Sequence, residues 1–170
     1  GTVELISNVE LTEAITIPAG ATVTLDLNGN DITAPINVII NNGTLTINDT
    51  VGNGNVYTTD VSAQGRATIV NYGTITINGG WYGDSNNDTT DRNAINRGNA
   101  IKNSGTAIIN GGYFTNVSNQ FISTEAYAYA INTLSGGTTT INNATVYGDI
   151  NGLIFSDGNT VVNDGSFSLG

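Results

Sequence analysis

The segment GDSNNDTTDRNAINRG at positions 83–98 carries residue types that bind metal ions. Asp84, Asn86 and Asp88 alternate with other residues in it, and such alternation can direct three oxygens toward a hard cation such as Ca²⁺. An EF-hand loop would also need Gly at its sixth position and Glu at its twelfth, and this segment has neither. Asx-rich turns use the same residue types to bond their own backbone. The segment therefore gives a weak Ca²⁺ hypothesis, beside that of an ordinary polar loop.

Charged residues near the insertions are the second candidate for chemistry. The basic residues Arg66, Arg97 and Lys102 stand close to one recurring strand. The Asp residues in the loops that lead to this strand are Asp60, Asp84, Asp88 and Asp91. Glycoside hydrolysis needs two carboxyl groups held about 5 to 10 Å apart, but no strand position supplies an Asp pair, and the chain has no His. We expect these charges to solvate loops, with binding as the next alternative and catalysis after it.

Outward-facing aromatic residues are the third candidate. Trp81 and Tyr113 each follow a recurring Asn by three residues, and alternation along a strand directs both side chains outward. A tyrosine stands two residues further along in each of the flanking repeats. Aromatic rings among polar groups suit sugars, whereas the alternative is that these large side chains only cover a cleft under the loops. The predicted ligand-binding residues are Trp81, Tyr113, Tyr57, Tyr147, Asp84 and Thr115.

A repeat positions all of these residues. Its copies, which include TLTIN, TITIN, TAIIN and TTTIN, start at positions 22, 44, 74, 106, 138 and 159 and are 21 to 32 residues apart. A constant core with a variable step predicts structural turns separated by loop insertions. Thr, Val, Ile and Asn dominate each copy and alternate with period two, which favours strands over helices.

Each copy predicts three short strands. In the second copy, for example, Leu45 and Ile47 face the interior and the flanking Thr residues face outward. Coils stacked about 4.8 Å apart bury such side chains in columns, for about 1.5–3 kcal/mol per large residue. An Asn column can bond amide to amide between coils, which would remove the cost of burying these amides unpaired. The predicted column is Asn28, Asn48, Asn78, Asn110, Asn142 and Asn163. The expected fold class is all-β, a single-stranded parallel β-helix (β-solenoid) of about six rungs with loop insertions.

The segment AIKNSGTAIINGGYF at 100–114 resembles the GTxTINGGxF repeats of large secreted or surface proteins of Gram-positive gut bacteria. From about Leu11 to Ser168 the chain looks like a right-handed parallel β-helix of the pectate-lyase-like superfold. The resemblance implies a fold and no single activity, because lyases, hydrolases, adhesins, phage fibres and ice binders share this superfold. Enzymes that it resembles use Asp clusters with Ca²⁺ and an Arg or Lys base, or several Asp with His, and this chain has no His.

The composition limits which partners the chain can bind and indicates its location. Lys and Arg total 4 against 14 Asp and Glu, and a net charge of −10 argues against binding to nucleic acid or anionic membranes. No stretch reaches the roughly 18 apolar residues of a membrane span. Only 11% of residues are charged, so that solubility rests on Asn, Thr and Gly, and the chain has no Cys. This composition predicts a secreted or cell-surface location.

We expect residues 1–170 to form a single β-helix module cut from a longer protein, because GSFSLG stops within a rung without a polar cap. The predicted function is non-catalytic adhesion, with a glycan or a host or partner surface protein bound and no cofactor apart from the weak Ca²⁺ hypothesis. The alternatives are a phage or virion fibre segment, a polysaccharide lyase-like fragment and an ice-binding protein. The last rests on an outward Thr-x-Thr array that Ile108 and Val161 interrupt.

Overall fold

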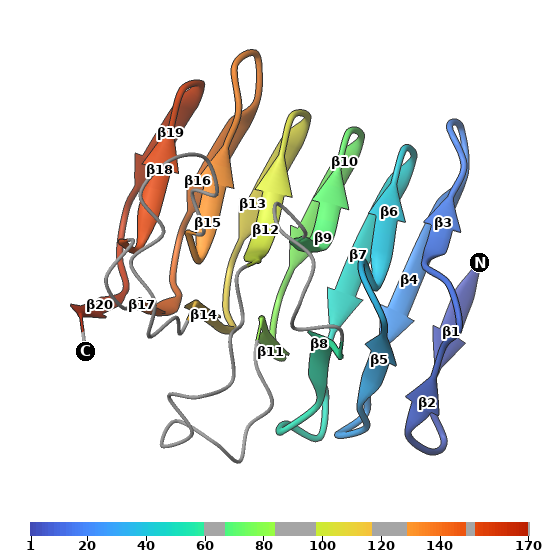
Figure 1. Cartoon of the computed structure of the whole chain (residues 1–170). Coiled ribbons are helices and arrows are strands. Elements are labelled where there is room, and N and C mark those ends of the chain that lie inside the picture. The colour runs from blue at the N-terminus through green and yellow to red at the C-terminus, as the bar shows by residue number, and fades with distance from the viewer. Residues whose placement is uncertain (60–66, 84–97, 117–128, 149–151, 170) are drawn as a thin grey trace.

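The computed structural model describes residues 1–59, 67–83, 98–116, 129–148 and 152–169. The regular elements in these ranges are short strands in three parallel sheets (Figure 1). Sheet A contains β1 (Thr2–Glu4), β4 (Thr22–Asp26), β7 (Thr44–Asn48), β10 (Thr74–Ile77), β13 (Thr106–Ile109), β16 (Thr138–Ile141) and β19 (Asn159–Val162). Sheet B contains β2 (Val9–Glu10), β5 (Ile32–Ala34), β8 (Asn55–Thr58), β11 (Trp81–Tyr82), β14 (Tyr113–Asn116), β17 (Thr145–Gly148) and β20 (Ser166–Leu169). Sheet C contains β3 (Ile15–Ile17), β6 (Ile39–Asn41), β9 (Ala67–Asn71), β12 (Asn99–Asn103), β15 (Ile131–Thr133) and β18 (Ile154–Ser156).

The chain passes through sheets A, B and C in turn and then begins the next coil. Each strand pairs in parallel with its equivalent one coil later, so that the two termini lie at opposite ends of the stack (Figure 1). This arrangement is a parallel β-solenoid, as the repeats predicted. Among the described residues, sheets A and B have seven strands and sheet C has six, so six complete coils are followed by a seventh with strands in A and B only.

The register in sheet A follows the sequence repeat. Thr44 pairs with Thr74, which pairs with Thr106 in the next coil. The strand β1 is an addition to the six predicted copies. It has the sequence TVE rather than a full Thr-x-Thr strand, and it pairs with β4 so that Thr2 lies beside Thr24.

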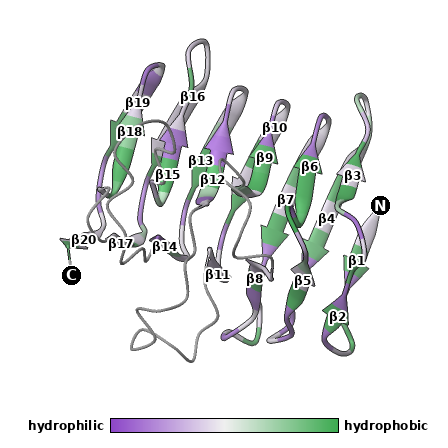
Figure 2. Ribbon diagram, in the orientation of Figure 1, coloured by the Kyte–Doolittle hydropathy of each residue, from purple (hydrophilic) through white to green (hydrophobic). Residues whose placement is uncertain are grey.

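Columns of apolar side chains fill the coil, as alternation predicted. The sheet C column consists of Ile15, Ile39, Ile69, Ile101, Ile131 and Ile154. Strands of this sheet such as β6, β9 and β18 are among the most hydrophobic in the chain (Figure 2). Ile69 and Ile101 are fully buried between neighbouring coils. In the last coil, Val162 and Phe167 are 47% and 37% exposed, because no coil covers them.

The predicted Asn column forms, with two corrections. Side-chain amides connect Asn48, Asn78, Asn110, Asn142 and Asn163 through bonds of 2.7–2.9 Å. Asn28 is not part of this outer ladder, because Asp26 takes the position in register with Asn48. Four of the five ladder residues are also exposed, so the ladder lies on the outer surface and satisfies no buried amide.

A second amide ladder lies inside the coil. Asn41 donates to Asn71 over 2.7 Å and Asn71 donates to Asn103 over 2.8 Å, and all three side chains are fully buried. Asn103 continues the network to the hydroxyl of Thr139, which shares a hydrogen bond with Thr133. This inner ladder, rather than the outer one, removes the cost of burying unpaired amides, which is about 1–3 kcal/mol each.

Candidate functional site

Trp81 and Tyr113 are neighbours in register on β11 and β14. Their ring centroids lie 4.2 Å apart and the ring planes are inclined by 24°, so the rings are stacked between adjacent coils. Both side chains are partly exposed. The next residues, Tyr82 and Phe114, form a parallel stack inside the coil at 5.0 Å. The repeat predicted that Trp81 and Tyr113 would be outward neighbours, and the structure confirms it.

The stacking changes what the pair can offer to a ligand. We expected a platform of ring faces, but each ring turns one face toward the other. On its other side Trp81 is in register with Asn55, which is 5% exposed and bonded to Asp31 over 2.7 Å. The pair is partly exposed and forms part of the lining of a groove.

This groove runs beside the turns that connect sheet A to sheet B, and we name it the turn groove. Its volume is about 380 Å³, and it crosses four consecutive coils. The lining residues are Asp49, Gly52, Asn53, Gly79, Gly80, Trp81, Gly112, Tyr113 and Thr145. Polar residues thus line the same space as the two aromatic side chains, which is the mixture that recognises a small polar ligand.

Glycines in the NGG turns allow close packing of the backbone beneath the groove. Gly80 and Gly112 have φ angles of 93° and 110°, which L side chains rarely adopt. A Cβ at Gly80 would lie 2.8 Å from Leu27 Cδ1 and 3.0 Å from the Tyr82 hydroxyl oxygen. The recurring NGG sequence therefore serves both the turn and the close packing beneath it.

Asp49 holds the backbone in place at the end of the turn groove that is nearest to the N-terminus of the stack. Its carboxylate accepts hydrogen bonds from the backbone N–H groups of Gly29, Gly52 and Gly54 at 2.8, 3.2 and 2.8 Å. Burial and, to a lesser extent, the negative charge of Asp49 raise the pKa of the Tyr82 hydroxyl, which donates to the Gly79 carbonyl over 2.7 Å. Sequence reasoning missed Asp49, although its position in the turn sequence NDTVGNGN is typical of an Asx-stabilised loop.

The other predicted ligand-binding residues lie at different depths. Tyr57 and Tyr147 are one coil before Trp81 and one coil after Tyr113, two residues further along their strands, and both are partly exposed. Thr115 is in register with Tyr147 but is only 4% exposed. The structure thus brings the four aromatic residues to one face of sheet B.

The predicted metal site lies outside the described residues, because Asp84, Asn86 and Asp88 fall in 84–97. The same holds for most of the charges considered for catalysis, namely Asp60, Arg66, Asp91 and Arg97. Among the residues that the structure describes, no group of three or more His, Cys, Asp or Glu could hold a metal ion. Lys102 is described, and it lies partly exposed on β12 in register with Asn132.

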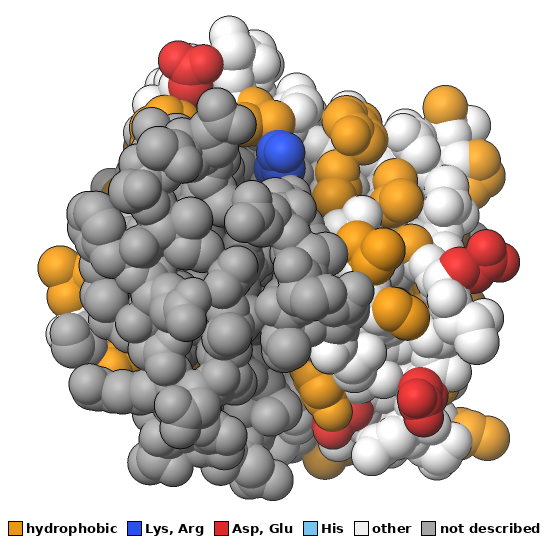
Figure 3. All heavy atoms as spheres, in the orientation of Figure 1, with side chains coloured by type: hydrophobic (Ala, Val, Ile, Leu, Met, Phe, Trp, Pro, Cys, Tyr) orange, Lys and Arg blue, Asp and Glu red, His pale blue; other side chains and the backbone are white. Residues whose placement is uncertain are grey.

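The outer face of sheet A is regular and uncharged over most of its area. The Thr columns through Thr44 and Thr46 run beside the outer amide ladder, with Ile108 and Val161 interrupting the second column. Among the described side chains on the side of the molecule seen in Figure 3, charged ones are few and scattered among polar and apolar ones. Within the described ranges there is no helix with the length and apolar character needed to cross a bilayer.

Comparison with protein-family models, with curated proteins and with solved structures found no match to this chain.

Proposed function

We propose that this chain is a non-catalytic binding module of a secreted or cell-surface protein, and that it binds a neutral glycan in the turn groove. The observation that carries the proposal is the stacked Trp81–Tyr113 pair, which lines a groove together with Asp49 and Asn53. Sugars combine apolar C–H faces with many hydroxyl groups, so they fit a site that pairs aromatic side chains with amide and carboxylate oxygens.

The length of the groove favours a chain of sugars over a single sugar. Four coils at about 4.8 Å each give it an elongated shape that follows the stack axis. Groove residues sit on turns that two flanking sheets hold in place, so little ordering is needed when a ligand binds. The net charge of −10 favours neutral ligands over acidic polysaccharides.

The secreted or cell-surface location is part of the same proposal. It is supported by the resemblance of the NGG-containing repeats to GTxTINGGxF surface proteins and by the low content of charged residues. A right-handed coil is the expectation for this fold, because parallel strand connections are almost always right-handed.

The test begins with a glycan array and continues with isothermal titration calorimetry on a neutral oligosaccharide that binds. Trp81→Ala should weaken binding by about 1–3 kcal/mol, in line with the loss of an aromatic contact. The matched control is Tyr72→Ala, which removes an aromatic side chain that is 58% exposed in the turn between β9 and β10. It should leave the affinity unchanged. Equal loss in both variants, or none in Trp81→Ala, would refute the assignment of the groove.

A further inference from the structure

Asparagine–glycine pairs recur in the turns of the stack, and such pairs can react without an enzyme. The backbone nitrogen of Gly attacks the side-chain carbonyl carbon of Asn, because Gly has no side chain to obstruct the approach. A bond forms between these two atoms, and the side-chain nitrogen leaves as ammonia with the proton of the Gly N–H. Water then opens the cyclic imide to Asp or isoaspartate. The described residues contain this pair at Asn28, Asn42, Asn53, Asn78 and Asn110.

Three of these pairs have a glycine nitrogen that already donates a hydrogen bond. The N–H groups of Gly29 and Gly54 donate to the Asp49 carboxylate, each over 2.8 Å. The N–H group of Gly43 donates to Oδ1 of Asn41 over 3.2 Å, and Gly43 is buried. The nitrogen must lose its proton to react, so a bond that holds the proton slows the attack. A negative carboxylate beside the nitrogen opposes the loss further.

The nitrogens of Gly79 and Gly111, in the two NGG turns, differ from these. Among the residues that the structure describes, neither N–H group has a hydrogen-bond partner, and both glycines are partly exposed. The side chains that they would attack belong to Asn78 and Asn110, which are exposed as well. These two pairs therefore lack the protection at the nitrogen that the other three have.

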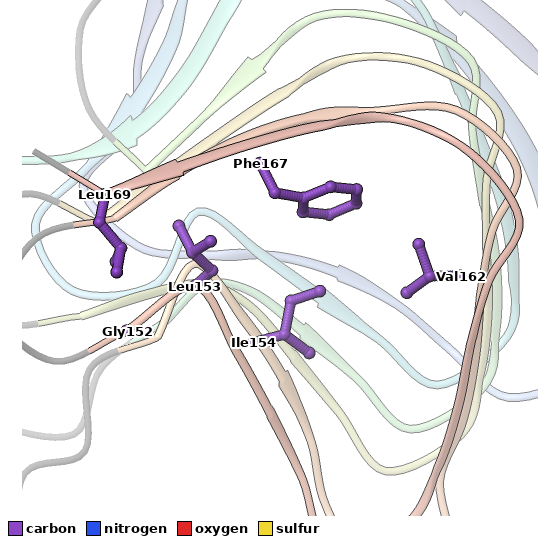
Figure 4. Close-up of a pocket in the computed structure, with 6 residues that line it drawn as sticks. All are labelled: Gly152, Leu153, Ile154, Val162, Phe167 and Leu169. Carbon is purple, nitrogen blue, oxygen red and sulfur yellow. The ribbon is translucent and has the colours of Figure 1, made fainter.

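The outer ladder restrains the side chains of these two pairs. Asn78 donates to Asn48 over 2.8 Å and accepts from Asn110 over 2.9 Å. Its carboxamide has to break both bonds before the carbonyl carbon can turn toward the glycine nitrogen. The ladder residues lie on the outside of the coil: Val162 points inward in Figure 4, and the ladder residue after it, Asn163, is exposed. Water can replace such bonds, so the restraint is partial.

The ladder has a direction, so its two reactive members are not equivalent. After deamidation of Asn110 the new carboxylate has no hydrogen to donate, and Oδ1 of Asn78 then faces a negative charge instead of a donor. After deamidation of Asn78 the new carboxylate still accepts from Asn110, through a charge-assisted bond that is stronger than the neutral one. The first event loosens Asn78, whereas the second holds Asn110 more tightly.

We propose that Asn78 and Asn110 are the sites of spontaneous deamidation in the folded chain, and that modification of Asn110 releases Asn78 whereas modification of Asn78 does not release Asn110. The outer ladder thus protects the two NGG turns chemically, although its exposed bonds satisfy no buried amide. This inference does not depend on the proposed glycan site.

The test follows deamidation of the full chain over time in a mildly alkaline buffer, by peptide mapping with mass spectrometry. In urea the Asn–Gly pairs should react at similar rates, because the following residue is the same. In the folded chain Asn78 and Asn110 should react about two- to tenfold faster than Asn28, Asn42 and Asn53, the factor that one hydrogen bond is worth. The proposal is overturned if one of the latter three reacts first, or if the folded chain does not react while the urea-treated chain does.

Two matched variants test the direction, since each adds one negative charge one coil away from Asn78. Asn110→Asp removes the donor to Asn78 and should accelerate its deamidation about two- to tenfold. Asn48→Asp strengthens the acceptor and should slow it. Thermal unfolding checks that both variants fold. In the parent chain the rate at Asn78, but not at Asn110, should rise as the incubation proceeds. Equal effects of the two variants on Asn78, or a constant rate there in the parent chain, would overturn the proposed coupling.

Discussion

The side-chain amide of Asn71 donates a hydrogen bond to Oδ1 of Asn103 over 2.8 Å in the interior of the coil. Asn41 donates to Asn71 in the same direction, toward the C-terminal end of the stack. The outer ladder has the opposite direction, since Asn110 donates back to Asn78 over 2.9 Å. The two ladders therefore differ both in direction and in exposure, and only the buried one lacks water as an alternative partner.

The first prediction compares the ladders. Asn71→Leu should lower the free energy of unfolding by about 1–3 kcal/mol, because Asn41 and Asn103 would each lose a buried partner. Asn78→Leu should cost less, because water can replace its exposed hydrogen bonds. Urea denaturation followed by circular dichroism measures both values. Equal losses would contradict the distinct roles of the two ladders.

The second prediction concerns Gly80, whose φ is 93°. Gly80→Ala should destabilise the fold by more than Gly20→Ala. Gly20 also has a positive φ, of 81°, but no atom lies within 4 Å of a Cβ added there. The Gly20 variant measures the backbone strain alone, about 1–3 kcal/mol, and the Gly80 variant adds the contacts with Leu27 and Tyr82. Thermal unfolding of both variants provides the comparison, and a Gly80→Ala protein as stable as Gly20→Ala would disprove the close packing.

The third prediction concerns acid stability. Burial tends to raise the pKa of Asp26, but hydrogen bonds from the Thr50 backbone and hydroxyl and from the Asn28 backbone outweigh it, so the folded-state pKa is below 3.8. A lowered carboxyl pKa contributes stability above the unfolded-state value, and this contribution disappears as the pH falls through the folded-state value. Asp26→Asn should therefore show a smaller loss of stability than the parent chain between neutral pH and this acidic range. Denaturation curves at several pH values test it, and unchanged pH dependence would count against the bonded carboxylate.

Much of the fold could be predicted from sequence because equivalent residues of each repeat occupy the same position in successive coils. Leu45 and Ile47 alternate with Thr at period two, and this pattern fixes both the inward face and the register. The inner ladder was missed because Asn41, Asn71 and Asn103 precede Gly by two residues, a spacing that is also typical of a surface turn. Only their register in the stack reveals that they are buried.

The candidate site was predictable in part. The spacing of Trp81 and Tyr113 from the turn Asn predicted that they would be outward neighbours, because residues of equal register meet in adjacent coils. It could not predict face-to-face stacking, which depends on side-chain rotamers. Nor could it identify Asp49, whose role depends on backbone N–H groups that converge from two different coils.

The intrinsic fluorescence of Trp81, the only Trp in the chain, tests the proposed glycan site most directly. Titration with a neutral oligosaccharide selected on the array should change the emission of the indole saturably, because the ligand would displace water from its exposed part. The dissociation constant from this titration should equal that from calorimetry. Calorimetric binding with unaltered Trp81 emission would place the ligand elsewhere and contradict the proposal.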